Sequence, residues 1–165
     1  MTSVCFYFQV HQPFRLKPYH FENIGEDHFY EFTQQNSDIL QRVAAKCYLR
    51  TNELILDLIG KHKGKFRVSY SISGVCLEQF ELYQPEVIES FKKLVATGCV
   101  EILAETYYHS LAFFYSRKEF DRQVAKHSDK VFQLFGVKPR VFRNTELMYS
   151  NDVAHHVAGL GYDGI

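Results

Sequence analysis

The chain has 165 residues, which is enough to bury one hydrophobic core, and 46% of them are hydrophobic. Its 19 acidic and 19 basic side chains give a formal net charge of zero, which argues against a nucleic-acid partner and against an anionic membrane surface. No run reaches the roughly 18 apolar residues of a membrane helix, and the apolar start lacks the basic region of a signal peptide, so we expect a cytoplasmic protein.

The first predicted element is a strand over residues 4–10, which are largely β-branched and aromatic. It ends at His11-Gln12-Pro13, because proline cannot donate a backbone hydrogen bond to a sheet. Residues 14–32 show neither helical nor strand periodicity. This pattern indicates a long ordered loop of the kind that usually serves a site.

Helical spacing begins at Ser37 and continues to about residue 65, with a break predicted near Arg50. A second strand is predicted over residues 66–72. Two helical pieces follow, over residues 75–83 and 85–96, the second opened by a proline that suits the first helical turn.

The third predicted strand covers residues 100–103. After a loop, Ser116 and Glu119 match the capping box that opens a helix, and this helix is predicted to run to Phe135 and to end at Gly136.

A fourth strand is predicted over residues 141–143, a short helix from Ser150 through Ala158, and a possible fifth strand after Gly161. Strands and helices alternate throughout, which predicts parallel strands with helical crossovers, as in an α/β barrel or an open doubly wound sheet. The usual glycine-rich dinucleotide and phosphate-binding motifs are missing from the sequence.

The four cysteines are widely spaced and form no Cys-x-x-Cys pair, so the sequence predicts neither a zinc ribbon nor a redox motif. We interpret all four as small, reduced core residues: Cys5, Cys47, Cys76 and Cys99.

Polar residues lie at or just beyond the carboxyl ends of four predicted strands, where a parallel barrel assembles its active site. They are His11, Gln12, Ser73, Glu105, His109, Asn144 and Glu146. Glycoside hydrolysis generally needs two carboxyl groups, together with side chains that bind sugar hydroxyls. One well-placed carboxylate and several hydroxyl-binding side chains are present in this set.

Two of these assignments have a structural alternative. Glu146 follows Arg140 and Arg143 and could be a salt-bridged glutamate, and His11 could be a core histidine with satisfied hydrogen bonds. Glu101 lies inside the third strand, where a carboxylate must be paired or lie at a barrel edge. The adjacent His155 and His156 lack the spacing of a zinc-binding pair on one helical face.

Three short segments resemble the signature regions of glycoside hydrolase family 57, the α-amylase and 4-α-glucanotransferase group. The first is residues 6–14 with His11-Gln12-Pro13, the second residues 98–102, and the third residues 142–147, which end in Asn-Thr-Glu-Leu. They occur in the family's order and cover the available chain.

The resemblance implies a parallel (β/α)7 barrel of the glycoside hydrolase and deacetylase type, of which residues 1–165 would be the N-terminal portion. It implies retaining cleavage or transfer of α-glucosidic bonds in an α-glucan or maltooligosaccharide, with Glu146 as the nucleophile and no metal or organic cofactor. We expect the substrate-binding residues to be His11, Gln12, Glu101, Glu105, His109 and Asn144.

The family's acid/base is an aspartate in a fourth region, and neither Asp152 nor Asp163 has that context. We therefore expect the rest of the barrel and any C-terminal domain to lie outside this chain, which alone should not turn over. Two alternatives stay open: a glucan-binding homologue without catalysis, and a metal-dependent polysaccharide deacetylase, which needs an Asp and two His around a metal. The sequence predicts no oligomeric state.

Overall fold

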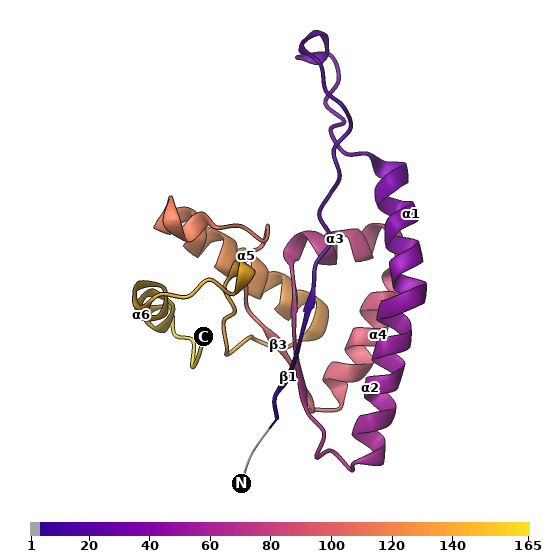
Figure 1. Ribbon diagram of the computed structural model, residues 1–165, viewed down its shortest axis with the longest axis vertical. Helices are drawn as coiled ribbons and strands as arrows, with labels where there is room; N and C mark the ends of the chain where they lie inside the picture. Colours follow the sequence, from indigo (N-terminus) through magenta and orange to yellow (C-terminus); the bar gives the residue numbers. More distant parts are fainter. Residues whose placement is uncertain (1–3) are drawn as a thin grey trace.

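The computed structural model describes residues 4–165 and is built on a parallel sheet (Figure 1). Its three strands are β1 (Phe6–Val10), β2 (Val68–Ile72) and β3 (Val100–Leu103), which lie in that order. The three strands were predicted, although β1 and β2 each begin two residues later than expected. Parallel pairing confirms the α/β class with helical crossovers.

The predicted fourth and fifth strands are reduced to single parallel bridges. Ala104 pairs with Phe142, and Val141 pairs with Gly164. The prediction of a full strand over residues 141–143 was therefore too strong, because the chain turns away into a short 3₁₀ segment, η4 (Thr145–Leu147), directly afterwards. The bridges still continue the parallel order of the sheet.

One long helical rod covers the sheet on one side (Figure 1). It consists of α1 (Thr33–Val43), a π-helical segment η2 (Ala44–Tyr48) and α2 (Leu49–Lys61). The rod starts four residues before the predicted position, and the predicted break near Arg50 is wrong. Asn52, a poor helix former, is buried there and donates a hydrogen bond to the Ser90 hydroxyl at 2.8 Å, so tertiary structure overrides local preference.

Two further helices, α3 (Gly74–Tyr83) and α4 (Pro85–Ala96), complete this side and match their predicted ranges closely. The main hydrophobic core lies between these helices and the sheet. Its largest fully buried members are Leu40, Tyr70, Ile72, Leu77, Phe80, Phe91 and Leu94.

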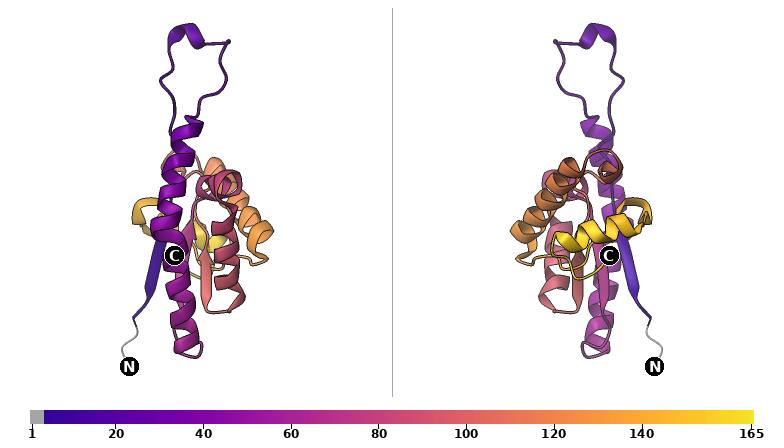
Figure 2. Two further views of the ribbon diagram at one scale, coloured as in Figure 1. Left: turned by 90° about the vertical axis from the view of Figure 1, so that its right-hand side faces the viewer. Right: turned by 90° about the vertical axis from the view of Figure 1, so that its left-hand side faces the viewer.

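On the other side of the molecule lie α5 (Arg117–Phe135) and α6 (Asn151–Gly159) (Figures 1 and 2). Both predicted N-caps are present: the hydroxyl of Ser116 accepts from the Glu119 amide, and that of Ser150 accepts from the Val153 amide, each at 3.2 Å. Gly136 ends α5 in the left-handed conformation, with φ +70°. A second core forms here around Phe113, Phe120, Phe142, Val153 and Val157.

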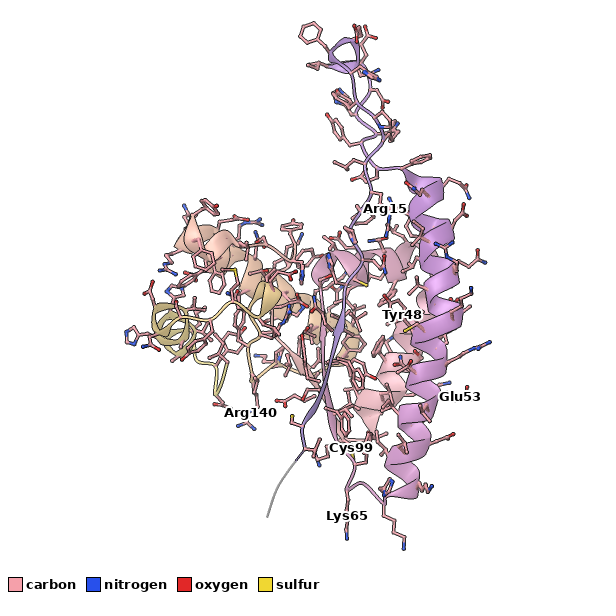
Figure 3. All side chains as sticks on the ribbon, viewed as in Figure 1. Arg15, Tyr48, Glu53, Lys65, Cys99 and Arg140 are labelled. Atoms are coloured by element: carbon pink, nitrogen blue, oxygen red, sulfur yellow. The ribbon has the colours of Figure 1, made fainter. Side chains whose placement is uncertain are left out.

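Residues 14–32, which we call the arm, project beyond the end of the helical rod (Figures 1 and 2). Arg15 lies at its base (Figure 3), where its backbone is bonded in both directions to the buried amide of Asn36. An antiparallel bridge joins Leu16 to Glu31, which confirms the predicted ordered loop. The rings of Phe21 and Phe29 are almost fully exposed, at 85% and 80%.

The prediction for the cysteines is half correct. All four are free, and Cys76 and Cys99 are buried, but Cys5 and Cys47 are exposed. Cys47 lies on the solvent side of the rod, and Cys5 precedes the first paired residue of β1. Separately, none of the helices in residues 4–165 is both long enough and apolar enough to span a membrane.

Candidate active site

The carboxyl ends of the parallel strands bring distant polar residues together, as predicted. His11 follows β1, Ser73 follows β2, Glu105 and His109 follow β3, and Glu146 follows the bridge at Phe142. Direct contacts link all five side chains, and we call this group the strand-end cluster.

His109 lies at the centre of the strand-end cluster. Its Nδ1 is 3.0 Å from Oε2 of Glu105, and its Nε2 is 3.3 Å from Oε1 of Glu146. The side-chain amide nitrogen of Gln9 also lies 3.2 Å from Nε2 of His109. His109 has φ +54°, an uncommon backbone conformation for a residue other than glycine.

The Glu105 side chain is fully buried, which is unusual for a carboxylate. One oxygen contacts His109, whereas the other, Oε1, has no hydrogen-bond partner among the described residues 4–165. Its backbone amide donates to Nδ1 of His127 at 3.4 Å, and Nε2 of His127 donates to the Ile72 carbonyl at 2.8 Å. Burial lowers the pKa of His127, which fits the neutral tautomer that this pair of bonds requires.

His11 and His109 have different electrostatic surroundings. Nδ1 of His11 is 2.7 Å from the Ser73 hydroxyl, and its ring stacks on that of His109. Burial, followed by the charge of His109, lowers the pKa of His11 to about 4. The hydrogen bond to Glu105 raises the pKa of His109. Of these two histidines, His109 is therefore the more readily protonated.

The Glu146 carboxylate lies at the surface, with 69% of its side chain exposed. The alternative of an arginine salt bridge is not what the structure shows, because Arg140 pairs with Asp163 and Arg143 donates to Gln9. Both Glu146 and Leu147 have φ +55°, so two successive residues occupy the left-handed region. This backbone points the carboxylate toward His109 and solvent.

Three predicted site residues lie outside the strand-end cluster. Gln12 is bonded to Arg15 at 3.0 Å and to the Tyr48 hydroxyl at 3.4 Å, on the side of the helical rod. Asn144 donates to the Met148 carbonyl at 2.9 Å and braces the turn that carries Glu146. Glu101 lies near the amino end of β3, beside Ser69, and so at the wrong end of the strand for this cluster.

Sequence reasoning missed Gln9 and Arg143. Arg143 is 6% exposed and donates from Nη2 to Oε1 of Gln9 at 2.8 Å. Its Nε and Nη1 have no hydrogen-bond partner in the part of the chain that the structure describes. The alternation of side chains along β1 could have revealed Gln9. Gln9 and Tyr7 point to one face of the sheet, whereas the apolar Phe8 and Val10 point to the other face.

A cavity of about 490 Å³ lies against this face of the sheet. Its lining includes Tyr7, Glu101, Arg143, Asn144, Met148 and Tyr149. A larger cavity of about 550 Å³ lies at the amino ends of the strands. Neither cavity is lined by a member of the strand-end cluster, although Asn144 and Leu147 in the lining of the smaller one flank the turn that carries Glu146. Within residues 4–165, no group of three or more His, Cys, Asp or Glu side chains is placed to hold a metal ion.

Residues 5–165 match the family model described as glycosyl hydrolase family 57. A curated protein of Methanocaldococcus jannaschii, named "Putative alpha-amylase", is 42% identical over 98% of this chain. The chain spans 35% of that protein's length.

Solved structures give the fold. The 4-alpha-glucanotransferase of Thermococcus litoralis matches 96% of this chain with a TM-score of 0.67 and 16% identity, over 21% of its own length. The peptidoglycan deacetylase PdaC of Bacillus subtilis matches 70% of this chain with a TM-score of 0.52 and 19% identity, over 51% of its length. The predicted fold class, part of a parallel (β/α)7 barrel, is confirmed.

Proposed function

Because the chain belongs to glycosyl hydrolase family 57, we propose that it carries the nucleophile of a retaining enzyme of α-glucan metabolism. The observation that supports this role is the placement of Glu146. Its carboxylate is exposed at the carboxyl ends of the strands, and its one hydrogen-bonding neighbour in residues 4–165 is the His109 ring. A carboxylate that attacks a sugar must be both accessible and ionised.

In the proposed reaction, an oxygen of Glu146 bonds to the anomeric carbon of an α-glucoside. The glycosidic C–O bond breaks, and its electron pair stays on the leaving oxygen, which takes a proton from a carboxylic acid. Water or an acceptor hydroxyl then attacks the glycosyl-enzyme ester, gives its proton to that carboxylate, and releases Glu146. Hydrolysis and transfer differ only in this acceptor.

The second carboxyl group is proposed to come from outside these residues. Glu105 is linked to Glu146 through His109, but it is fully buried behind that imidazole and cannot reach a leaving oxygen. The chain would thus form the N-terminal portion of a single catalytic barrel, and alone it would not turn over. Its 35% share of the relative's length supports this reading.

We propose that His11 and Arg143 bind sugar hydroxyls next to Glu146. His11 is half-buried at the cluster. Arg143 lies on the cavity wall and has two buried guanidinium nitrogens that find no partner within residues 4–165. Buried donors without partners carry an energetic cost that a ligand hydroxyl would relieve. The substrate would be an α-glucan or a maltooligosaccharide, and the four free cysteines fit the expected cytoplasmic location.

The deacetylase alternative has support from fold alone, since the likeness to PdaC is at 19% identity. The family model and the 42% identical relative both favour the glycosidase. Fold similarity does not choose between chemistries on one scaffold.

The test is a maltooligosaccharide cleavage and transfer assay on the complete gene product that contains this chain. Glu146→Gln keeps the shape of the side chain but removes the nucleophile, so we expect activity to fall by about 10³-fold or more. Glu53→Gln, at an exposed position on α2 (Figure 3), is the matched control and should be fully active. Full activity of Glu146→Gln would end the proposal.

A further inference from the structure

We propose that Glu105 and His109 are positioning residues for Glu146: the buried Glu105 carboxylate holds His109 as an imidazolium, which in turn orients Glu146. This inference extends the proposed function, because it assigns a role around the same carboxylate. It replaces the sugar-binding role that the sequence suggested for these two residues.

The first argument is the count of protons on the His109 ring. Each ring nitrogen faces a carboxylate oxygen, Oε2 of Glu105 at 3.0 Å and Oε1 of Glu146 at 3.3 Å. Ionised carboxylates only accept hydrogen bonds, and a neutral imidazole has one N–H to donate. Donation to both carboxylates requires both nitrogens to be protonated, and therefore a positive ring.

The second argument is the burial of Glu105. An ionised carboxylate away from water is costly unless a charge of opposite sign contacts it. Among residues 4–165, the side chain bonded to the Glu105 carboxylate is that of His109. The buried His127 bonds to the backbone amide and not to the carboxylate, and it fixes this segment against α5.

The remaining neighbours of the His109 ring determine the pH range in which His109 is an imidazolium bonded to both carboxylates. His11, which stacks on the His109 ring, is held neutral by burial, whereas the positive charge of Arg143 opposes protonation of His109. Gln9 competes for Nε2, because its amide nitrogen is 3.2 Å away and can donate only to an unprotonated nitrogen. Above the pKa of His109, Nε2 would bond to Gln9 and leave Glu146 without its donor.

The chemical consequence is that the two carboxylate oxygens of Glu146 have different roles. The imidazolium bonds to Oε1 and leaves Oε2 free to attack. A charge-assisted bond is about twice as strong as a neutral one and so fixes the orientation better than a neutral histidine would. Loss of the imidazolium should lower kcat more than it raises KM.

The test is a titration of His109 by ¹⁵N NMR in the 165-residue chain, in wild type, Glu105→Gln, Glu146→Gln and Glu53→Gln. In wild type near neutral pH, we expect both ring nitrogens of His109 to give imidazolium shifts, while His11 gives neutral ones. Glu105→Gln should lower the pKa of His109 by about one unit or more, Glu146→Gln by less, and Glu53→Gln not at all.

A neutral His109 in wild type near pH 6, or the same pKa in wild type and Glu105→Gln, would overturn the inference. The wild-type measurement stands even if Glu105→Gln does not fold. In the complete gene product, Glu105→Gln should move the basic limb of the kcat profile to lower pH. The proposed function fails separately, if Glu146→Gln stays active.

Discussion

The imidazole rings of His11 and His109 lie stacked, with centroids 4.0 Å apart and planes within 19°, although they follow different strands. Two positive rings at that distance would repel each other, so one proton on the pair is favoured over two. Glu105 draws that proton to His109, while burial, followed by the charge of His109, lowers the pKa of His11 to about 4. The fold therefore carries a charged and a neutral histidine side by side.

The first prediction concerns stability in acid. Between pH 6.5 and 4, His11 is protonated in the unfolded chain but not in the fold, so the free energy of unfolding should fall as the pH falls through this window. Because the ring is half-buried, we expect about 1–2 kcal/mol after allowance for solvent screening. Urea unfolding of His11→Asn at pH 4.5 and 7 should show a smaller acid loss than wild type.

Two other histidines also contribute to the pH dependence of the free energy of unfolding. The buried His127, whose pKa is lowered, adds an acid loss of the same sign that His11→Asn retains. His109 has the opposite sign: its contribution is full below its unfolded pKa and is lost as the pH rises through its raised value. An equal acid slope in wild type and His11→Asn would show that His11 titrates normally in the fold.

The second prediction concerns the contact between Gly74 and Tyr107. A Cβ at residue 74 would overlap the Tyr107 ring. The backbone carbonyl of Tyr107 also accepts a hydrogen bond from the Val75 amide at 3.2 Å. Gly74→Ala should therefore lower the free energy of unfolding by about 1–3 kcal/mol and shift the segment that carries Glu105 and His109. Thermal melting measures the first effect, and the His109 NMR signal the second.

Gly60 provides the matched control, because a Cβ there meets no atom within 4 Å and the residue is inside α2. Gly60→Ala should raise stability by up to about 1 kcal/mol through helix propensity. In a Tyr107→Ala background, Gly74→Ala should cost little. A full cost in that background would place the strain somewhere other than the ring.

The local signals of the sequence predicted most element boundaries, and the reasons are visible in the structure. Pro85 opens α4, Ser116 caps α5, and Gly136 ends α5 with a positive φ. Such signals act within a few residues of the chain. The continuity of the rod was not predictable, because the bond from Asn52 to Ser90 joins residues 38 apart.

The same distinction applies to the site. Parallel strand order was enough to predict that His11, Glu105, His109 and Glu146 lie together, and the structure confirms this placement; their roles stay predictions. Gln12 lies outside the cluster, because its side chain is bonded to Tyr48 on the rod and to Arg15, and its substrate-binding role stays a prediction. Side-chain direction after a strand end depends on contacts with distant residues, which a sequence pattern does not specify.

The third prediction concerns the backbone of Glu146, at φ +55°. Residues with a Cβ pay about 1–2 kcal/mol in this region, whereas glycine does not. Glu146→Gly should therefore be more stable than Glu146→Ala by about 1 kcal/mol, since the entropy of glycine offsets part of the relief. At the exposed helical position 53, the order of the same two substitutions should reverse. Equal stabilities at residue 146 would show a relaxed backbone there.

The last prediction concerns association of the 165-residue chain. Within residues 4–165, β1 is paired along one edge only, with β2, and the arm exposes the rings of Phe21 and Phe29. Open strand edges and exposed aromatic rings both favour contact with a second copy. We expect concentration-dependent self-association by size-exclusion chromatography with light scattering.

Variants separate the two contributions to this association. The pair Phe21→Ser and Phe29→Ser should reduce the apparent mass if the arm makes the contact, whereas Leu54→Ser, at a 57% exposed position on α2, should leave it unchanged. Association that persists in the arm variant would instead assign the contact to the open edge of β1, where a charged residue should block pairing. A monomer at every concentration would contradict the prediction, because it would mean that neither surface binds a second copy of the chain.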